Sequence, residues 1–195
     1  MLTLCIDTAY KYLTCVLIRD DKILSSYSEE CFKKQSEEVF SALDTVFKKA
    51  NVEKRSIDSI CISKGPGSYT GVRIAMSIAK VIGETLPCDV YTISTLRLYA
   101  AGRENCMVLM DARADRVYCG IYDKENVLSK DQAIAIKDLD IKDYQIIGDG
   151  ALVGKNNDYG DIPEAFLKTK AMWEKVDTIS YLTPEYLKES ESYYR

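Results

Sequence analysis

The sequence predicts an α/β protein built from two tandem lobes, each a mixed β-sheet with flanking helices. The first observation is that short apolar runs rich in strand-forming residues alternate with segments whose apolar residues recur at helical spacing. The second is that this pattern restarts at Asn105, where a shift of 104 residues places CIDTAYKYLTCVLIRDDKILS on LMDARADRVYCGIYDKENVLS without a gap. The shift pairs Asp7 with Asp111 and Cys15 with Cys119.

We interpret this shared strand–Asp–turn–strand–turn–strand pattern as a duplicated unit, with a coincidental likeness between two β-meanders as the alternative. The duplication predicts a first lobe at residues 1–102 and a second at residues 103–195. We expect the C-terminal tail to pack back on the first lobe. A chain of 195 residues is long enough to bury a hydrophobic core.

Three strands and a helix are expected to open the first lobe. Residues 2–7 (LTLCID) form a short apolar run that ends at an Asp, residues 13–19 form a second run, and residues 23–24 begin a third. Their short connections predict an antiparallel meander. Residues 36–50 follow with apolar side chains at helical spacing, which predicts a helix whose N-cap is Ser36.

Two further strand–helix pairs complete the predicted lobe. Residues 57–63 (IDSICIS) resemble a buried strand, and a Gly-rich turn then leads into a helix at about 70–84. A strand at 89–93 and a helix at 95–101 come next. Three leading strands, an Asp closing the first, and helices after them are the plan of the actin/Hsp70/sugar-kinase superfamily. We therefore expect two RNase H-like or actin-like (ASKHA) lobes.

Composition limits the chemistry that the chain can perform. It contains no histidine, which excludes Ser-His-Asp triads, Cys-His pairs and His-ligated metals. Its formal net charge is -4, whereas proteins that bind nucleic acid tightly usually carry a basic face for phosphate contacts. Composition leaves catalysis by Asp, Glu, Lys or Tyr side chains open. We expect no His-ligated metal site, and contact with RNA only through a partner.

The cysteines and the N-terminal segment indicate the cellular compartment that we expect for the protein. The seven cysteines include no Cys-x-x-Cys pair, and most lie in apolar runs where a free thiol behaves as a small hydrophobe. The N-terminal segment has no basic region followed by a long apolar run, and no stretch approaches 18 apolar residues. We expect free thiols in a reducing cytoplasm and no membrane span.

The turn at Asp7-Thr8-Ala9 is the first candidate site. In nucleotide-binding members of the superfamily, the first hairpin carries an Asp-x-Gly-Thr turn that faces phosphate and Mg²⁺. Here Thr8 and Ala9 stand where a Gly would let the backbone approach phosphate. The alternative is that Asp7 and Thr8 satisfy turn amides through their side chains. Asp111 in the second half has the same two interpretations.

The Gly-rich turn at residues 65–73 (GPGSYTGVR) is the second candidate site. It follows a buried strand and opens a helix, so its N–H groups could bind an anion. It is not a Walker A loop, because no Lys follows Gly71. A plain helix-capping turn is the alternative. With the first turn, it gives these residues as candidates for facing a nucleotide or anion: Asp7, Thr8, Gly65, Gly67, Ser68, Thr70 and Arg73.

The helix after that turn carries small residues at four-residue spacing, namely Gly71, Ala75, Ala79 and Gly83. Apolar side chains surround this stripe, so the helix is apolar almost all round and should be covered on both faces. We expect the stripe to contact another subunit, with burial inside the chain as the alternative. The first interpretation predicts that Ala75→Arg or Ala79→Arg leaves the monomer folded and abolishes pairing.

Several of these segments resemble a known family. Residues 4–9 (LCIDTA) resemble the opening of the TsaB (YeaZ) proteins. Residues 63–74 (SKGPGSYTGVRI) are similar, nearly residue for residue, to their Gly-Pro-Gly-Ser-Phe/Tyr-Thr-Gly-Val-Arg segment. Residues 94–96 (STL), 110–113 (MDAR) and 184–188 (PEYLK) continue the likeness in order, so it covers the full chain.

The resemblance implies a non-catalytic scaffold and activator that pairs with TsaD through its two N-terminal helices and forms a homodimer when TsaD is absent. It implies that TsaE assembles on the pair, that TsaC supplies threonylcarbamoyl-adenylate, and that TsaD transfers the group to adenosine 37 of tRNA. No cofactor is expected to bind tightly, although ATP or ADP could be shared at a partner interface. The interface residues expected are Val39, Leu43, Gly71, Val72, Ala75, Met76, Ala79 and Gly83.

Two departures from the family matter. TsaD carries a His-x-x-x-His metal pair that this chain cannot supply, so the resemblance implies an inactive homologue of a metal-dependent, glycoprotease-like fold. Family members often have a His-Ser pair at the start of the first helix, where Gln35-Ser36 stands here. The competing hypothesis is an ATP-dependent phosphotransferase of the acetate- or sugar-kinase type that uses Asp7 and Asp111 around Mg²⁺. A metal-dependent peptidase is a third, weaker alternative.

Overall fold

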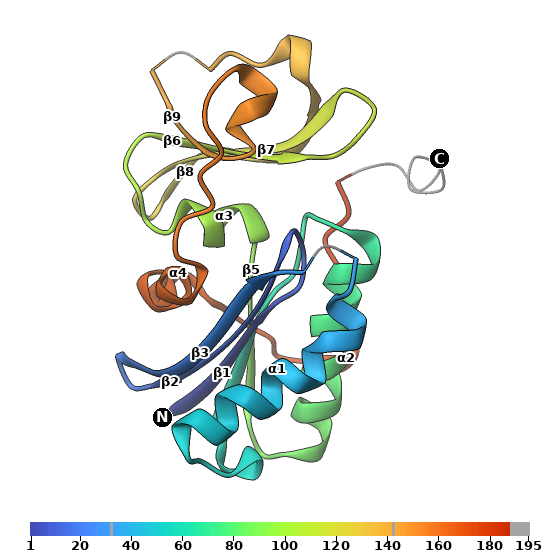
Figure 1. Ribbon diagram of the computed structural model, residues 1–195, viewed down its shortest axis with the longest axis vertical. Coiled ribbons are helices and arrows are strands. Elements are labelled where there is room, and N and C mark those ends of the chain that lie inside the picture. The colour runs from blue at the N-terminus through green and yellow to red at the C-terminus, as the bar shows by residue number, and fades with distance from the viewer. Residues whose placement is uncertain (32, 142, 188–195) are drawn as a thin grey trace.

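The computed structural model describes residues 1–31, 33–141 and 143–187. Two β-sheets lie one above the other in Figure 1, with helices on the outside of the lower sheet and between the two. Among the described residues, no helix combines the length and the apolar character needed to cross a membrane. All seven cysteines carry free thiols.

The first three strands form the expected meander. β1 (Leu2–Asp7), β2 (Tyr12–Arg19) and β3 (Lys22–Glu30) pair in antiparallel fashion, in sequence order. Every residue of β1 is buried, because the strand lies in the middle of the sheet and both of its faces are covered.

Three more strands extend this sheet to the order β10-β5-β4-β1-β2-β3. β4 (Ser59–Ser63) and β5 (Asp89–Ile93) add in parallel to β1, as strands separated by helices should. The short β10 (Glu174–Lys175) pairs with β5 in antiparallel fashion at the edge of the sheet. β10 comes from residues that the sequence assigned to the second lobe.

Two helices cover one face of this sheet, α1 (Gln35–Ala50) and α2 (Tyr69–Thr85) (Figure 1). Their inward side chains share a core cluster with the strands. α2 begins at Ser68, whose hydroxyl oxygen accepts a hydrogen bond from the backbone N–H of Gly71.

The expectation that Ser36 caps α1 is wrong. The helix already contains Gln35, and the N-cap position is Lys34, which makes no side-chain cap hydrogen bond. Gln35 is buried, and its Nε2 donates to the backbone oxygen of Tyr10 at 2.8 Å. A tertiary contact with the first hairpin therefore fixes the start of the helix.

The second sheet repeats the first. β6 (Cys106–Asp111), β7 (Arg116–Asp123), β8 (Asn126–Ala135) and β9 (Gln145–Gly148) lie in the order β8-β7-β6-β9. That order matches β3-β2-β1-β4, with the same two antiparallel pairs and the same parallel pair. The 104-residue shift brings the start of β1 to the start of β6 and the start of β2 to the start of β7. The predicted repeated unit and the two-sheet fold class are confirmed.

The two sheets share a core between them. α3 (Thr95–Ala100) packs on β6 and β7, whereas α4 (Ile162–Lys168) packs on β2 and β3, so each helix contacts the sheet of the other half (Figure 1). One buried cluster therefore contains residues of both sheets and both helices. The boundary at residues 102 and 103 stays a prediction.

The other face of the second sheet has a different cover. Where α1 and α2 lie in the first half, the described residues of the second half form only short 3-10 turns, η2 (Ile136–Asp138) and η3 (Gly150–Val153). A small cluster around Leu109 and Val117 lies beneath them. Among its described residues, the second half thus repeats four strands of the first without an α-helix on this face.

Candidate functional site

The backbone of the Gly-rich turn packs directly against the backbone of the first hairpin. A Cβ added to Gly67 would lie 2.3 Å from the backbone oxygen of Ala9, and one added to Gly71 would lie 2.2 Å from that of Thr8. The Ser68 N–H donates to the same Ala9 oxygen at 2.7 Å. The space in which a phosphate would meet the turn is thus filled by the hairpin.

We expect Gly67→Ala to lower the free energy of unfolding by about 2 kcal/mol, because the clash is with backbone, which cannot move aside as a side chain can. Gly102→Ala is the control. An added Cβ there would meet no heavy atom within 4 Å, although the φ of +70° disfavours any side chain. Urea unfolding followed by circular dichroism compares the two variants, and an equal loss in both would mean that the turn has room.

Asp7 and Thr8 are buried and fully used inside the chain. The Asp7 carboxylate accepts hydrogen bonds from Ser63 Oγ at 2.5 Å, Ala9 N at 3.0 Å and Tyr99 Oη at 3.1 Å. Burial raises the pKa of this carboxyl, although the three hydrogen bonds oppose the shift. Thr8 Oγ1 donates to the Gly71 oxygen at 2.6 Å and accepts from Ala75 N at 3.2 Å. The expectation that these two side chains face a nucleotide is corrected, because neither reaches solvent.

The remaining candidates of the turn divide into two groups. Gly65 has a φ of +105°, and a Cβ there would lie 2.7 Å from the backbone oxygen of Glu185. Arg73 stacks on Tyr69, with Cζ 4.0 Å from the ring centroid, and its Nε donates to Tyr186 Oη at 2.9 Å. Both therefore hold the C-terminal segment. Ser68 and Thr70 are exposed, and their contact with an anion stays a prediction.

The small-residue stripe of α2 faces inward. Ala75 and Ala79 are 0% exposed, and Gly83 would meet Val90 and Ile179 if it carried a Cβ. The predicted interface is corrected for its buried members, which belong to the core of this chain: Val39, Leu43, Gly71, Val72, Ala75, Met76 and Ala79. Small residues are needed on this face because α2 approaches the hairpin and the sheet most closely there.

Exposed apolar side chains lie elsewhere on the two helices. Phe40 of α1 is 67% exposed and Val81 of α2 is 61% exposed, while Ile74 and Ile78 are partly buried. The prediction that α2 is apolar on two faces thus agrees with the structure, but the face that remains open is the one with large residues.

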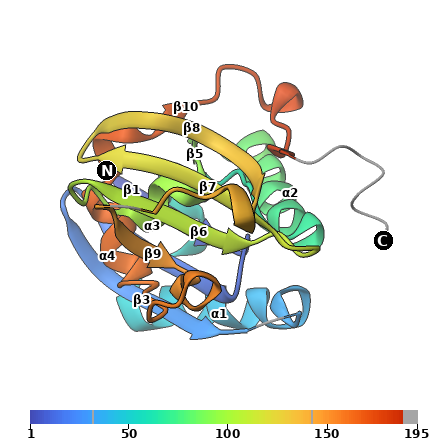
Figure 2. The same cartoon turned by 90° about the horizontal axis from the view of Figure 1, so that it is seen from above.

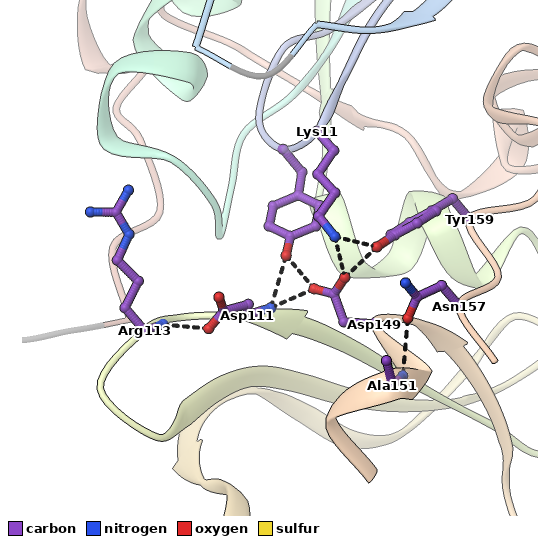
Figure 3. Close-up of polar contacts among 8 residues, drawn as sticks. Lys11, Asp111, Arg113, Asp149, Ala151, Asn157 and Tyr159 are labelled. Carbon is purple, nitrogen blue, oxygen red and sulfur yellow. Dashed lines mark hydrogen bonds and ion pairs between the residues drawn. The ribbon is translucent and has the colours of Figure 1, made fainter. Parts of the chain in front are cut away.

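A polar cluster that sequence reasoning missed joins the two halves (Figure 3). Asp149 follows β9 and is 4% exposed. One carboxylate oxygen accepts from Tyr10 Oη and, at 2.7 Å, from the Asp111 N–H. The other accepts from Lys11 Nζ at 2.7 Å and from Tyr159 Oη. The first hairpin is therefore tied to the ends of β6 and β9.

The charges of this cluster stabilise one another. Burial opposes ionisation of Asp149, but the hydrogen bonds from Lys11, Tyr10 and Tyr159 hold the pKa of its carboxyl below the ordinary value. Burial and Asp149 together raise the pKa of Tyr159 to about 12. The only sequence signal was an Asp between two glycines after an apolar run, at residues 148–150, which is a weak one.

A second carboxylate makes a similar contact elsewhere along the junction. Asp131 of β8 accepts hydrogen bonds from Ser94 Oγ, at the N-cap of α3, and from Tyr122 Oη. Burial raises the pKa of Asp131, and these two hydrogen bonds oppose the shift. Two carboxylates of the second half, the buried Asp149 and the half-buried Asp131, thus accept hydrogen bonds from the first.

This arrangement packs and orients the two halves and offers little for chemistry. Asp111, the counterpart of Asp7, is exposed, whereas Asp7 is buried and already accepts three hydrogen bonds inside the chain. Within residues 1–31, 33–141 and 143–187, no group of three or more Cys, Asp or Glu side chains is placed to hold a metal ion.

The comparisons with known proteins agree on one family. The family model described as "TsaD: tRNA N6-adenosine threonylcarbamoyltransferase" matches residues 23–183. The Bacillus subtilis protein named tRNA threonylcarbamoyladenosine biosynthesis protein TsaB is 31% identical over 132 residues, 66% of this chain and 58% of the relative. A protein of the same name from Buchnera aphidicola is 29% identical over 64% of this chain and 62% of the relative. The chain thus spans about three fifths of the length of these relatives.

Two solved structures from Pseudomonas aeruginosa share the fold. One is titled an uncharacterized protein with similarity to peptidase YEAZ, with a TM-score of 0.80 and 20% identity, covering 96% of this chain and 99% of that one. The other, titled YeaZ, has a TM-score of 0.77 and 19% identity, covering 95% and 99%. At this identity the likeness concerns the fold.

Proposed function

Because the chain belongs to the family described as TsaD: tRNA N6-adenosine threonylcarbamoyltransferase, and its relatives in sequence and fold are TsaB (YeaZ) proteins, we propose that it is a non-catalytic subunit in threonylcarbamoylation of adenosine 37 of tRNA. It acts as a scaffold and activator. TsaD is its direct partner, TsaE assembles on the pair, and TsaC supplies the activated threonylcarbamoyl group. The chain meets tRNA only through this assembly.

The contacts that the Gly-rich segment makes inside the chain are the main observation behind this proposal. The stretch most similar to TsaB proteins, residues 63–74, packs the first hairpin, the start of α2 and the C-terminal segment against one another. The Asp of the first hairpin is buried beneath it. A segment occupied in this way supports a role in shaping a surface rather than in binding substrate.

The surface proposed for pairing is the exposed apolar face of α1 and α2, defined by Phe40, Ile74, Ile78 and Val81. Phe40 and Val81 are large exposed apolar side chains of the kind that partner subunits cover, and Ile74 and Ile78 are partly buried. In the absence of TsaD, the same patch accounts for self-association of this chain into a homodimer. The proposed surface lies on the two helices that the sequence predicted, but it consists of other residues than those predicted.

The geometry disfavours the competing phosphotransferase. Such an enzyme needs its first-hairpin Asp beside Mg²⁺ and phosphate, and Asp7 here is enclosed by Ser63, Ala9 and Tyr99. We therefore place any ATP or ADP bound by the assembly at the interface with a partner. Isothermal titration of the isolated chain with Mg-ATP should give no micromolar binding.

We expect Val81→Arg to lower the affinity for TsaD of the same organism by about tenfold or more, because a charge would be desolvated in the contact. Phe40→Arg should act in the same direction. Leu128→Arg is the matched control, because Leu128 is 56% exposed on the second sheet. Isothermal titration measures binding, and unchanged circular dichroism excludes misfolding. Equal affinity of all three variants would contradict the assigned surface.

A further inference from the structure

The loop between β6 and β7 has an unusual backbone. Arg113, Ala114 and Asp115 have φ angles of 61°, 52° and 53° in succession. Left-handed backbone is disfavoured for residues with a Cβ, and three in a row without a glycine is rare. Such a conformation persists only where the surroundings hold it, and it occurs most often at functional positions.

Several contacts hold this loop. The Asp111 carboxylate accepts a hydrogen bond from the Arg113 N–H at 2.7 Å, while the Asp111 N–H donates to Asp149 at 2.7 Å. The Arg116 N–H donates to the Arg113 oxygen at 3.1 Å, and the Ile136 N–H donates to the Asp115 oxygen at 2.9 Å. The root of the loop is thus anchored in the buried Asp149 cluster, and backbone hydrogen bonds hold its tip.

Comparison with the equivalent turn of the first half shows which neighbours the β6–β7 loop does not have. Its counterpart in the first half is the hairpin turn at residues 8–11, where Thr8 and Ala9 are buried against the Gly-rich turn and α2. In the second half no α-helix among the described residues replaces α2, and residues 113–116 are exposed. The Arg113 guanidinium makes no hydrogen bond or ion pair with any described residue, and Figure 3 shows it directed away from Asp149. The loop thus presents a cation that has no partner among residues 1–31, 33–141 and 143–187.

The charges around Arg113 indicate the class of partner. Asp111 and Asp115 lie on either side of it in the loop, and both are exposed. These carboxylates would repel the continuous phosphates of a nucleic acid, and the chain as a whole carries a net charge of -4. A protein surface with a single carboxylate suits this pattern better, since a guanidinium binds one carboxylate through two parallel hydrogen bonds.

The loop also lies where a partner on α2 could reach it. Figures 1 and 2 both show the β6–β7 loop projecting on the same side of the molecule as α2. A protein that covers the exposed apolar face of α1 and α2 would extend toward Arg113 from there.

We infer that Arg113 is a second contact for the partner protein, which binds a carboxylate on that partner and fixes its orientation relative to the apolar patch. This inference rests on the proposed function for the identity of the partner. Arg113 contacts the partner directly, and Asp111 acts as a positioning residue that holds the loop in its binding conformation.

The test compares the wild-type chain with Arg113→Glu in isothermal titration against TsaD of the same organism. We expect a loss of affinity of about tenfold, which shrinks as salt is raised because the contact is ionic. Lys155→Glu makes the same change of charge at an exposed site of the same half and should bind as the wild type does. Asp111→Ala should weaken binding, and Asp111→Asn should restore it, because its amide oxygen can still accept the Arg113 N–H.

The outcomes separate the two proposals. If the wild-type chain binds TsaD and Arg113→Glu binds equally well, Arg113 is no contact while the proposed function stands. If the wild-type chain does not bind TsaD, the proposed function fails first. If Arg113→Glu leaves pairing unchanged but weakens binding of a tRNA transcript to the assembled complex, the loop serves nucleic acid and the inference is overturned.

Discussion

Ala79→Arg should unfold the protein or leave it barely stable. Ala79 is 0% exposed and belongs to the core cluster that joins α2 to the first sheet. An arginine there must either displace the helix from the sheet or bury its charge. Either route costs about 3–5 kcal/mol, a large share of the net stability of about 5–15 kcal/mol that domains have. Ala75→Arg should behave in the same way, since Ala75 is also 0% exposed.

Urea unfolding measured by circular dichroism and tryptophan fluorescence checks this expectation. Val81→Arg is the matched control, because it places the same side chain two residues later on the same helix, at a position that is 61% exposed. It should change the free energy of unfolding by less than about 0.5 kcal/mol. A stable, monomeric Ala79→Arg variant that fails only to pair with TsaD would restore the original assignment of the small-residue stripe to the interface.

Asp149→Ala should be the second most damaging substitution. It removes the acceptor of Tyr10, Lys11, Tyr159 and the Asp111 N–H together, and leaves a partly buried ammonium group without its counter-charge. We expect a loss of about 3 kcal/mol in the free energy of unfolding. Asp149→Asn should cost less, because its amide oxygen still accepts. Asp138→Ala, at an exposed carboxylate on the second half, should be close to neutral.

The pH dependence gives an independent check on Asp149. The pKa of its carboxyl is lower in the folded state than the ordinary value, so its ionised form stabilises the fold at neutral pH. This contribution is lost as the pH falls below about 4, through the folded-state pKa. The difference in stability between the wild type and Asp149→Asn should therefore shrink in acid. A difference that stays constant from neutral pH to pH 3 would mean that the ion pair contributes nothing.

The strands could be predicted from the sequence because the pattern that indicates them is local and occurs in both halves of the chain. The alternation of apolar runs and turns fixed the first meander, and the likeness between the segments after Cys5 and Leu109 predicted its copy. Helix α2 was predicted with its apolar surfaces. Which face of α2 packs inward could not be predicted, because it depends on how closely the hairpin at Thr8 approaches Gly71.

The site at the junction could not be predicted because its partners are distant in sequence. Tyr10 and Asp149 are separated by 139 positions, and no pattern at either end marks the other. The start of α1 shows the same limitation. Ser36 has the residue type of an N-cap, but the contact from Gln35 to the Tyr10 backbone begins the helix one residue earlier.

Reconstitution of the modification reaction tests the central claim most directly. TsaC, TsaD and TsaE of the same organism are combined with ATP, threonine, bicarbonate and an adenosine-37 tRNA transcript, with or without this chain, and modified nucleoside is counted by mass spectrometry. We predict modification only when the chain is present, and less modification with Val81→Arg at the same concentration. Equal modification without the chain would contradict its role as a required subunit.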